Sequence, residues 1–286
     1  MLIEAISANA VTLGPLAFSG AMLAVVAGTV TAFGIGSGLH RRGRASPERA
    51  LWLLLLSAVL AARAAYVVRW WPEYAAHPVS IINLRDGGLS PWSGLVVLAL
   101  GAMAIGWRRR PLRAPLVWSL LGGVVVWGFA SLVVQRLAVS TNIPLPALVL
   151  HDLDGQPVPL RALSGRPTVI NLWATWCGPC RREMPVLEAA QQRMPGVRFV
   201  FANQGESAVQ VRRFLGAEKL RLEHVLIDDG MQLSVRYNVR AYPTTLFLDA
   251  QGYLRDSHMG ELSAATLAES VGRLDRAAIS VSGASP

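Results

Sequence analysis

The sequence predicts an all-α polytopic membrane domain with about four transmembrane helices over residues 1–138, followed by an α/β domain over residues 139–286, with a linker at about 139–146. Two observations carry this prediction. The chain is 52% hydrophobic and 16% charged, with a mean hydropathy of +0.39, which is too apolar for an ordinary soluble domain. The apolar excess lies in the first half, whereas short apolar runs in the second half alternate between strand and helix patterns.

Four nearly uncharged stretches are long enough to cross about 30 Å of hydrocarbon at about 1.5 Å per helical residue. They cover approximately residues 13–39, 51–69 (interrupted by Arg63), 89–107 and 114–135. The basic segment HRRGRASPER lies between the first and second stretches, and RRRPLR lies between the third and fourth. The N-terminus carries Glu4 and no basic residue. Basic short loops stay in the cytoplasm. We therefore expect a multi-pass protein of the bacterial inner membrane, with both termini and the second domain in the periplasm.

The formal net charge of +9 raises the question of a nucleic-acid partner. The arginines fall in short clusters beside apolar runs, where membrane topology accounts for them. We therefore expect contact with membrane lipid and no nucleic acid. A cleavable secretory signal is an alternative for the first stretch, although that stretch lacks a basic start and is longer than usual for a signal.

The second domain is expected to begin with a linker and a hairpin around Asp154-Gly155. The run TVINLWATW suits a central strand, and a helix that Pro185 should kink follows over residues 178–194. VRFVFANQ is then predicted to be a strand, residues 208–215 a helix, LEHVLID a strand and residues 232–237 a helix. A hairpin about Gln251-Gly252 and an amphipathic helix over 263–279 follow.

The chain has two cysteines, Cys177 and Cys180, in the segment VINLWATWCGPC. A strand that runs into a helix places Cys177 at the helix N-terminus, where free backbone N–H groups and the helix dipole favour an anion. We therefore expect a lowered pKa for the Cys177 thiol, whose thiolate is the nucleophile. Cys180 lies one turn later and is predicted to be the resolving thiol that expels a partner from a mixed disulfide.

The cysteine pair has three other candidate roles. A structural disulfide that closes so small a loop gives little stabilisation. A metal site needs two further ligands, but there is no second C-x-x-C or H-x-x-x-H, and the five histidines are scattered. Haem attachment requires a histidine where Arg181 stands. Redox exchange with no metal or cofactor is therefore the predicted chemistry.

The segments NLWATWCGPCRREMP and AYPTTLFLDAQG resemble the TlpA/ResA-like thiol:disulfide reductases of the thioredoxin superfamily, over about residues 143–276. The resemblance implies a thioredoxin-like fold and thiol:disulfide oxidoreductase activity. It also implies a cis peptide bond before Pro243, which brings the backbone of Tyr242 beside Cys177 to pair with a substrate peptide. Thr244 follows in the same motif, and Trp176 is expected to shield one side of the thiol pair. From the residues alone, a trans proline at a strand start is the commoner arrangement.

The same resemblance suggests the acid and base positions. Thioredoxins have a buried Asp on the strand before the motif, but here the matching residue is Asn171, which cannot accept a proton. In the ResA-like branch a Glu three residues after the second Cys assists, and Glu183 stands there. Residues three apart are neighbours on a helix, so Glu183 is predicted to serve Cys180. The alternative is that Glu183 only balances the helix dipole from the solvent face.

The direction of electron flow is inferred from the residues between the cysteines. DsbA-type oxidants have a His there, whereas Gly178 and Pro179 supply no cation, which predicts a reducing potential near the thioredoxin value of about −270 mV. Arg181 and Arg182 are expected to be exposed charges with little effect. The expected client is an exported protein with a disulfide. Because the predicted spans contain no cysteine, a separate transmembrane electron donor of the DsbD/CcdA type is implied.

The first half is similar to prolipoprotein diacylglyceryl transferase over about residues 14–134, through ARAAYVVRWWPEYAAHPVSIINLRDGGLSPWSG. The His that the transferases carry near the Gly pair is absent, since Ser90, Pro91 and Trp92 stand there. Arg63 inside a predicted span is either a functional residue or one that reaches the outer interface. Two alternative functions stay open: action on lipid or lipoprotein by the membrane half, and a non-catalytic thioredoxin-fold chaperone or binding module.

Overall fold

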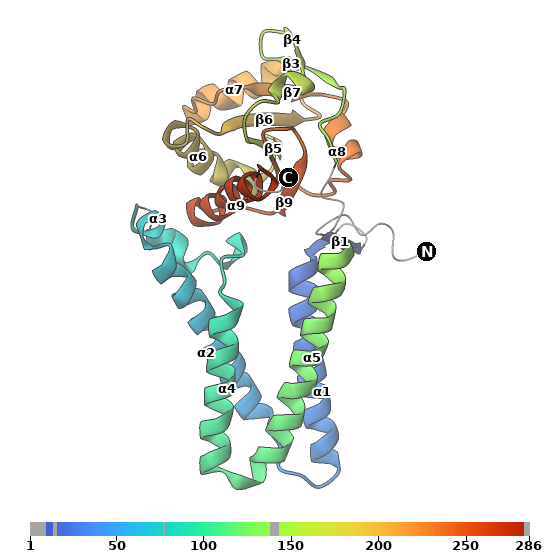
Figure 1. The fold of residues 1–286 in the computed structure, drawn as a ribbon, viewed down its shortest axis with the longest axis vertical. Helices are drawn as coiled ribbons and strands as arrows, with labels where there is room; N and C mark the ends of the chain where they lie inside the picture. The colour runs from blue at the N-terminus through green and yellow to red at the C-terminus, as the bar shows by residue number, and fades with distance from the viewer. Residues whose placement is uncertain (1–9, 14–15, 77, 138–142, 283–286) are drawn as a thin grey trace. The chain divides into compact units, whose positions relative to one another are not determined.

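The computed structural model describes residues 10–13, 16–76, 78–137 and 143–282 (Figure 1). Contacts within the chain divide it into a helical unit, Phe18–Leu137, and a second unit that contains the main sheet. Before the helical unit, β1 (Ala10–Leu13) and β2 (Leu16–Ser19) form a small two-stranded sheet. The first apolar stretch was expected to be helical from residue 13, so its first residues differ from that expectation.

The helical unit consists of two pairs of long helices. α1 (Gly20–Arg41) packs along α5 (Arg113–Leu137), and α2 (Glu48–Arg69) packs along α4 (Pro91–Arg108) (Figure 1). Four helices of the described chain are long and apolar enough to cross a membrane, which confirms the predicted helical class of the first half. Short helical segments join them: α3 (Trp71–Ala76), η1 (Pro78–Ile82), η2 (Leu84–Asp86) and η3 (Arg110–Leu112).

Small residues allow α1 and α5 to approach closely. The buried positions of α1 recur every four residues and are all glycine or alanine: Gly20, Ala24, Gly28, Ala32 and Gly36. A Cβ atom added to Gly28 would lie 2.8 Å from the carbonyl oxygen of Gly123, and one added to Gly123 would lie 2.8 Å from that of Gly28. The two backbones therefore pack against each other as membrane helices with small residues do.

Arg63 of α2 is buried and fixes the segment between α2 and α4. Its Nη1 donates to Asp86 Oδ1 at 2.9 Å and to the carbonyl of Gly88 at 2.8 Å. Nε and Nη2 donate to the carbonyls of Ile81, Ser80 and Asn83, each at 2.9 Å. Asp86 also accepts from Tyr74 Oη at 2.9 Å. Both alternatives for Arg63, a functional residue or one that reaches the outer interface, stay open, and the structure shows that its side chain is paired inside the fold with only 6% exposed.

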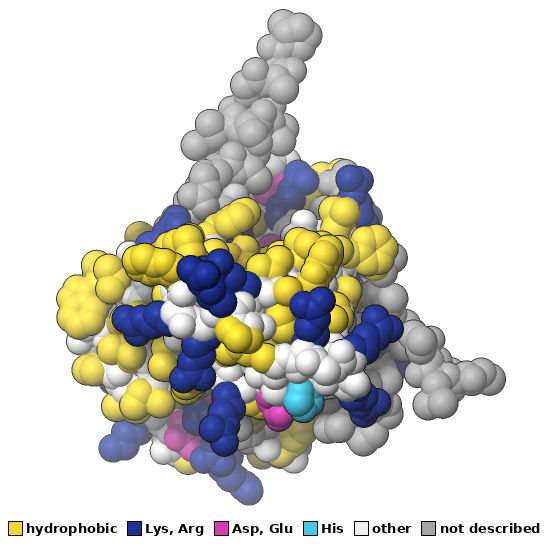
Figure 2. All heavy atoms as spheres, turned by 90° about the horizontal axis from the view of Figure 1, so that it is seen from below, with side chains coloured by type: hydrophobic (Ala, Val, Ile, Leu, Met, Phe, Trp, Pro, Cys, Tyr) yellow, Lys and Arg dark blue, Asp and Glu magenta, His cyan; other side chains and the backbone are white. Residues whose placement is uncertain are grey.

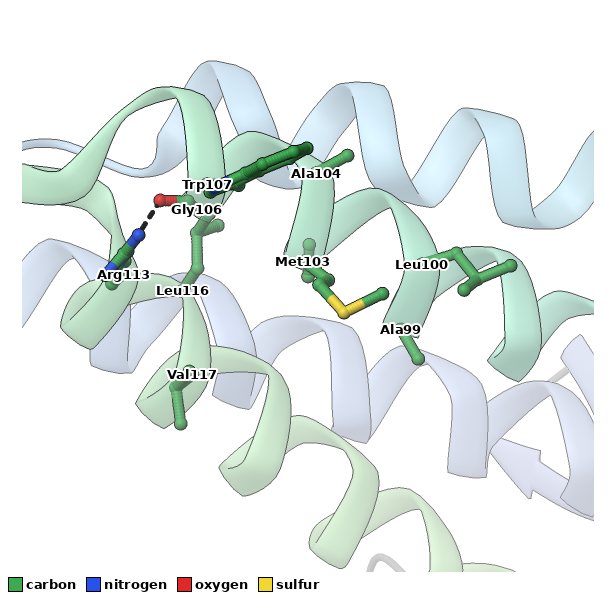
Figure 3. A pocket seen from close by; sticks show the side chains of 10 residues that line it. Ala99, Leu100, Met103, Ala104, Gly106, Trp107, Arg113, Leu116 and Val117 are labelled. Atoms are coloured by element: carbon green, nitrogen blue, oxygen red, sulfur yellow. Dashed lines mark hydrogen bonds between the residues drawn. The ribbon is translucent and has the colours of Figure 1, made fainter.

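The opposite end of the helical unit carries exposed arginines, among them Arg41, Arg42, Arg44, Arg109 and Arg110. Seen from this end, basic side chains stand among apolar ones (Figure 2). An apolar pocket lies nearby between α4 and α5, with Met103, Trp107 and Leu116 in its wall (Figure 3). Arg113 closes one end of the pocket by donating from Nε to the carbonyl of Gly106 at 2.8 Å. The exposed arginines at this end belong to the two basic loops from which the membrane orientation was predicted.

The second unit is built on a seven-stranded sheet in the order β4-β3-β7-β6-β5-β8-β9. Its strands are β3 (Val149–Asp152), β4 (Pro157–Pro159), β5 (Thr168–Trp173), β6 (Arg198–Gln204), β7 (Val225–Asp228), β8 (Thr244–Leu248) and β9 (Leu254–Met259). β5, β6 and β7 are parallel, and the β3–β4, β3–β7, β5–β8 and β8–β9 pairs are antiparallel. The expected central strand and both hairpins are confirmed.

Helices cover both faces of this sheet. One core contains residues of β5, β6 and β8 together with α6 (Gly178–Arg193), α7 (Ala208–Glu218) and α9 (Ala264–Ser282). The opposite core contains the other side chains of these strands with η4 (Leu160–Leu163) and α8 (Gln232–Arg236). Every residue of β5 is buried because the strand lies inside the sheet with helices on both sides.

The linker expected at 139–146 lies partly outside the described residues, at 139–142. Its remainder belongs to the fold, since Leu145 N donates to Gly252 O at 2.9 Å and Leu254 N donates to Ile143 O at 2.9 Å. The predicted helix after the cysteines is α6, and it continues through Pro185.

Candidate active site

The cysteine pair lies where β5 leads into α6. Cys177 is the N-cap residue of α6, and its Sγ accepts a hydrogen bond from the backbone N–H of Cys180 at 3.2 Å. The two residues form a disulfide with their Cα atoms 5.2 Å apart. Cys180 is fully buried and Cys177 is 5% exposed. The expected difference in depth is present, and the Cys177 sulfur occupies the position where a helix N-terminus stabilises negative charge.

The expected substrate-binding residues lie in two segments. The Tyr242–Pro243 peptide bond is cis, as the resemblance implied. Trp176, beside the disulfide, is 70% exposed and packs edge-on against the ring of Tyr242, with the ring centroids 6.1 Å apart. Thr244 is buried at the start of β8, and its hydroxyl donates to Ala241 O at 2.7 Å. The structure thus brings together Trp176, from the cysteine motif, and Tyr242, from the segment before β8.

Glu183 is fully buried, so the alternative that it lies on the solvent face is wrong. Its Oε1 accepts from Asn171 Nδ2 at 2.8 Å, and its Oε2 accepts from Leu262 N at 3.0 Å. Asn171 Nδ2 also donates to Thr245 Oγ1 at 3.0 Å. Burial raises the pKa of Glu183 to about 8, although the hydrogen bonds from Leu262 and Asn171 act in the opposite direction.

The arginines after the motif are exposed, as expected, and each forms an ion pair. Arg181 forms an ion pair with Glu218, and Arg182 pairs with Glu261 at 2.9 Å. Both arginine side chains are about half exposed, at 52% and 51%. As surface pairs these contacts contribute little stability, but each arginine has an acidic neighbour.

Sequence reasoning missed two buried polar residues at the end of β6. Glu206 accepts hydrogen bonds from Thr175, directly before Trp176, and Gln204 is linked through Ser234 to Tyr242. The only signal in the sequence was an acidic residue in the loop NQGES after a predicted strand, and acidic residues are common in exposed loops. Among the residues that the structure describes, no group of three or more His, Cys, Asp or Glu side chains is placed to hold a metal ion.

A redox-active cysteine pair at the N-terminus of a helix, after a central strand and with a cis proline before β8, defines a thioredoxin-like thiol-disulfide oxidoreductase. The chain matches the family model Redoxin over residues 140–271 and the model Prolipoprotein diacylglyceryl transferase over residues 8–155.

Individual relatives and a solved structure match the second half of the chain. Thioredoxin-like protein YneN of Bacillus subtilis is 32% identical over 133 residues, which are 45% of this chain and 77% of the relative. Thiol-disulfide oxidoreductase ResA of Geobacillus kaustophilus is 30% identical over 159 residues, 54% of this chain and 90% of the relative. The solved structure of a secreted disulfide oxidoreductase of Mycobacterium tuberculosis, homologous to DsbE, is 26% identical with a TM-score of 0.40. The match covers 46% of this chain and 96% of that structure's chain.

The chain therefore belongs to the ResA-like thiol-disulfide oxidoreductases through its second half, and its first half belongs to the prolipoprotein diacylglyceryl transferase family.

Proposed function

We propose that this protein is a membrane-anchored reductase that uses Cys177 and Cys180 to reduce disulfides of exported proteins on the periplasmic side of the bacterial inner membrane. The observation that carries the proposal is the position of the Cys177 sulfur at the N-terminus of α6, with the N–H of Cys180 directed at it. Support for the location comes from four apolar helices and from arginine-rich loops at one end of the helical unit.

In the reduced enzyme, the Cys177 thiolate attacks one sulfur of the client disulfide, and the other client sulfur leaves as a thiolate. Cys180 then loses its proton and attacks the Cys177 sulfur of the mixed disulfide. The second client sulfur leaves, and two electrons have moved from the cysteine pair to the client. The product is the Cys177–Cys180 disulfide, which is the form seen in the structure.

Glu183 is the proposed proton acceptor for Cys180. It lies three residues further along α6, on the neighbouring position of the helix, and both residues are fully buried. Its pKa of about 8 is close to the ordinary thiol value of about 8.5, so the proton moves between groups of similar affinity. Asn171 holds the carboxylate on one side and Leu262 N holds it on the other.

The client is proposed to bind as an extended segment against the backbone of Tyr242 and Pro243, with Trp176 and Thr244 beside it. The exposed ring of Trp176 offers apolar contact area, which most peptide segments can use. After each turnover the disulfide must be reduced again. The helical unit contains no cysteine, so a transmembrane donor of the DsbD/CcdA type is proposed to supply the electrons, while membrane lipid surrounds the helices.

The test uses the full chain in detergent. The wild-type protein is expected to accelerate the reduction of insulin by dithiothreitol, and Cys177→Ser is expected to be inactive. Cys180→Ala should accumulate mixed disulfides with exported proteins in cells, which identifies the clients. Absence of insulin reduction by the folded wild-type protein would refute the proposal. A non-catalytic chaperone would instead protect a client from aggregation equally well with and without Cys177.

The transferase family match supports a second candidate, in which the membrane half acts on lipid or lipoprotein. Two observations count against it. The His that the transferases carry near the Gly pair is absent from the segment Ser90-Pro91-Trp92. The N–H groups of Arg63 are used by Asp86 and by backbone carbonyls of the same chain. Transfer of radiolabelled lipid to a lipoprotein peptide by the full chain would establish this activity, and its absence in the folded protein would refute it.

A further inference from the structure

We propose that Glu206 and Gln204, at the end of β6, are positioning residues that hold the two sides of the client-binding site. Glu206 fixes the turn that carries Trp176, and Gln204 fixes Tyr242 through Ser234. This inference rests on the proposed function, because it concerns the same site, and it adds two residues that have no part in the sulfur chemistry.

The Glu206 side of the proposal rests on three short hydrogen bonds. Glu206 is 7% exposed, and its Oε2 accepts from the backbone N–H of Thr175 at 2.7 Å. Its Oε1 accepts from the hydroxyl of Thr175 at 2.5 Å, and Oε2 also accepts from Asn203 Nδ2 at 2.7 Å. Hydrogen bonds to a buried carboxylate are stronger than neutral ones. Glu206 therefore holds both the backbone and the side chain of Thr175.

Thr175 belongs to the turn that leads into the active site. The backbone N–H of Cys177 donates to the carbonyl of Ala174 at 3.2 Å, so Thr175 and Trp176 are the two central residues of that turn. A residue that fixes Thr175 also fixes the backbone that carries the Trp176 ring, whereas the Cys177 sulfur is held separately at the N-cap of α6. Glu206 thus acts on Trp176 through Thr175.

The Gln204 side of the proposal is a chain of buried hydrogen bonds. Ser234 Oγ donates to Gln204 Oε1 at 2.7 Å, and a bond of 2.8 Å joins Ser234 Oγ to the hydroxyl of Tyr242. A serine hydroxyl has one proton, which is used toward Gln204, so Tyr242 is the donor in the second bond. Gln204 Nε2 in turn donates to Asp228 Oδ2 at 3.0 Å. Tyr242 is therefore held from β6 and β7.

The sheet explains why one strand end serves both sides. β5 and β6 are parallel, with Trp173 paired to Asn203, so the turn after β5 and the loop after β6 leave the same edge of the sheet. Gly205 has a φ of +76°, in the region that favours glycine, and its N–H donates to Asp228 O at 3.0 Å. The chain turns at this glycine, and Glu206 follows directly.

The consequence concerns client binding. The rings of Trp176 and Tyr242 lie 6.1 Å apart, on opposite segments of the site, and each is held from the end of β6. Neither Glu206 nor Gln204 has a hydrogen bond to a cysteine in the described structure. Their loss should therefore weaken recognition of a protein client more than it slows attack on a small disulfide, which does not need both aromatic residues.

The experiment measures KM and kcat of the full chain in detergent with two substrates, insulin and oxidised glutathione. Glu206→Gln and Gln204→Met are expected to raise KM for insulin by about tenfold, the size expected for losing a hydrogen bond to a buried charged or polar group. The rate with oxidised glutathione should change by less than about twofold. Glu188→Gln is the matched control, because Glu188 also accepts a backbone N–H, from Arg221, but on the exposed side of α6.

Two further variants make the test independent of folding. Thr175→Ser keeps the hydroxyl donor and should leave KM for insulin nearly unchanged, whereas Thr175→Val should raise it. The double variant Glu206→Gln, Thr175→Val should raise KM for insulin no more than the more damaging single substitution does. Both substitutions act on the same interaction, the hydrogen bond between the Thr175 hydroxyl and Glu206. Any of three results would overturn the inference. They are equal losses of activity with insulin and oxidised glutathione, an unchanged KM for insulin in Glu206→Gln and Thr175→Val, or fully additive effects on KM in the double variant. If wild-type protein reduces neither substrate, the proposed function itself fails.

Discussion

Replacing Glu183 with glutamine should remove the pH dependence that this residue gives to the stability of the fold. Burial raises the pKa of Glu183 from 4.5 to about 8, and this difference corresponds to roughly 5 kcal/mol at about 1.4 kcal/mol per tenfold change. Between these two pH values the folded protein binds a proton that the unfolded chain has released. The contribution to the free energy of unfolding is therefore fully present below pH 4.5 and is lost as the pH rises to about 8.

The glutamine side chain of the Glu183→Gln variant carries no charge at any pH, so the variant lacks this loss. We expect it to be equal to or slightly less stable than wild type near pH 5, because one hydrogen bond to Asn171 or Leu262 is changed for the worse. Above about pH 8 we expect it to be more stable, by up to a few kcal/mol, because the buried charge is gone. The stabilities of the two proteins should cross between these conditions.

Thermal unfolding of wild type and variant, compared at each pH in the same detergent, measures this difference. The contribution of the helical unit cancels in the comparison because the substitution lies in the other unit. An infrared carboxyl band that is present in wild type, absent in Glu183→Gln and titrates near pH 8 would identify the group directly. A titration midpoint near 4.5, or a stability difference that stays constant with pH, would refute the reasoning.

Four further outcomes follow from the packing and the site. Asn171→Leu removes a hydrogen bond that lowers the pKa of Glu183, so the midpoint of the pH–rate profile for release of a mixed disulfide should move above its wild-type value. Trp176→Ala should raise KM for insulin several-fold without changing the melting temperature, because the ring is 70% exposed; a large drop in melting temperature would contradict this. Arg63→Ala leaves Asp86 buried without its cation and should cost about 3–5 kcal/mol, seen as faster proteolysis between α2 and α4. Gly28→Val should lower the unfolding free energy of the helical unit by about 1–3 kcal/mol, measured by unfolding in sodium dodecyl sulfate, since its Cβ would meet backbone at 2.8 Å.

The features that could be predicted from the sequence are those set by neighbours along the chain. The length of the nearly uncharged apolar stretches predicts the four long helices, and an apolar run followed by C-G-P-C predicts a sulfur at a helix start. The partners of Arg63 and Glu206 were not predicted, because Asp86 lies 23 residues and Thr175 lies 31 residues from them. Such pairs form only after the strands or helices between them have packed. The burial of Glu183 was also left open, since its position on α6 allowed both an inward and an outward direction.

The pairing of Asn171 with Glu183 indicates how the proposed base is held. The amide of Asn171 on β5 cannot take a proton, but its Nδ2 donates to the carboxyl group that α6 brings to it, at 2.8 Å. Burial is the largest cause that raises the pKa of Glu183, and the charge of Glu261 adds to it. The donors Leu262 and Asn171 restrain the rise, so that the pKa reaches about 8. A higher pKa would leave almost no carboxylate at neutral pH, and a lower one would make the group a poorer acceptor for a thiol proton. The amide at residue 171 therefore supports the proposed proton transfer without carrying the proton, because its hydrogen bond lowers the pKa of the group that would receive it.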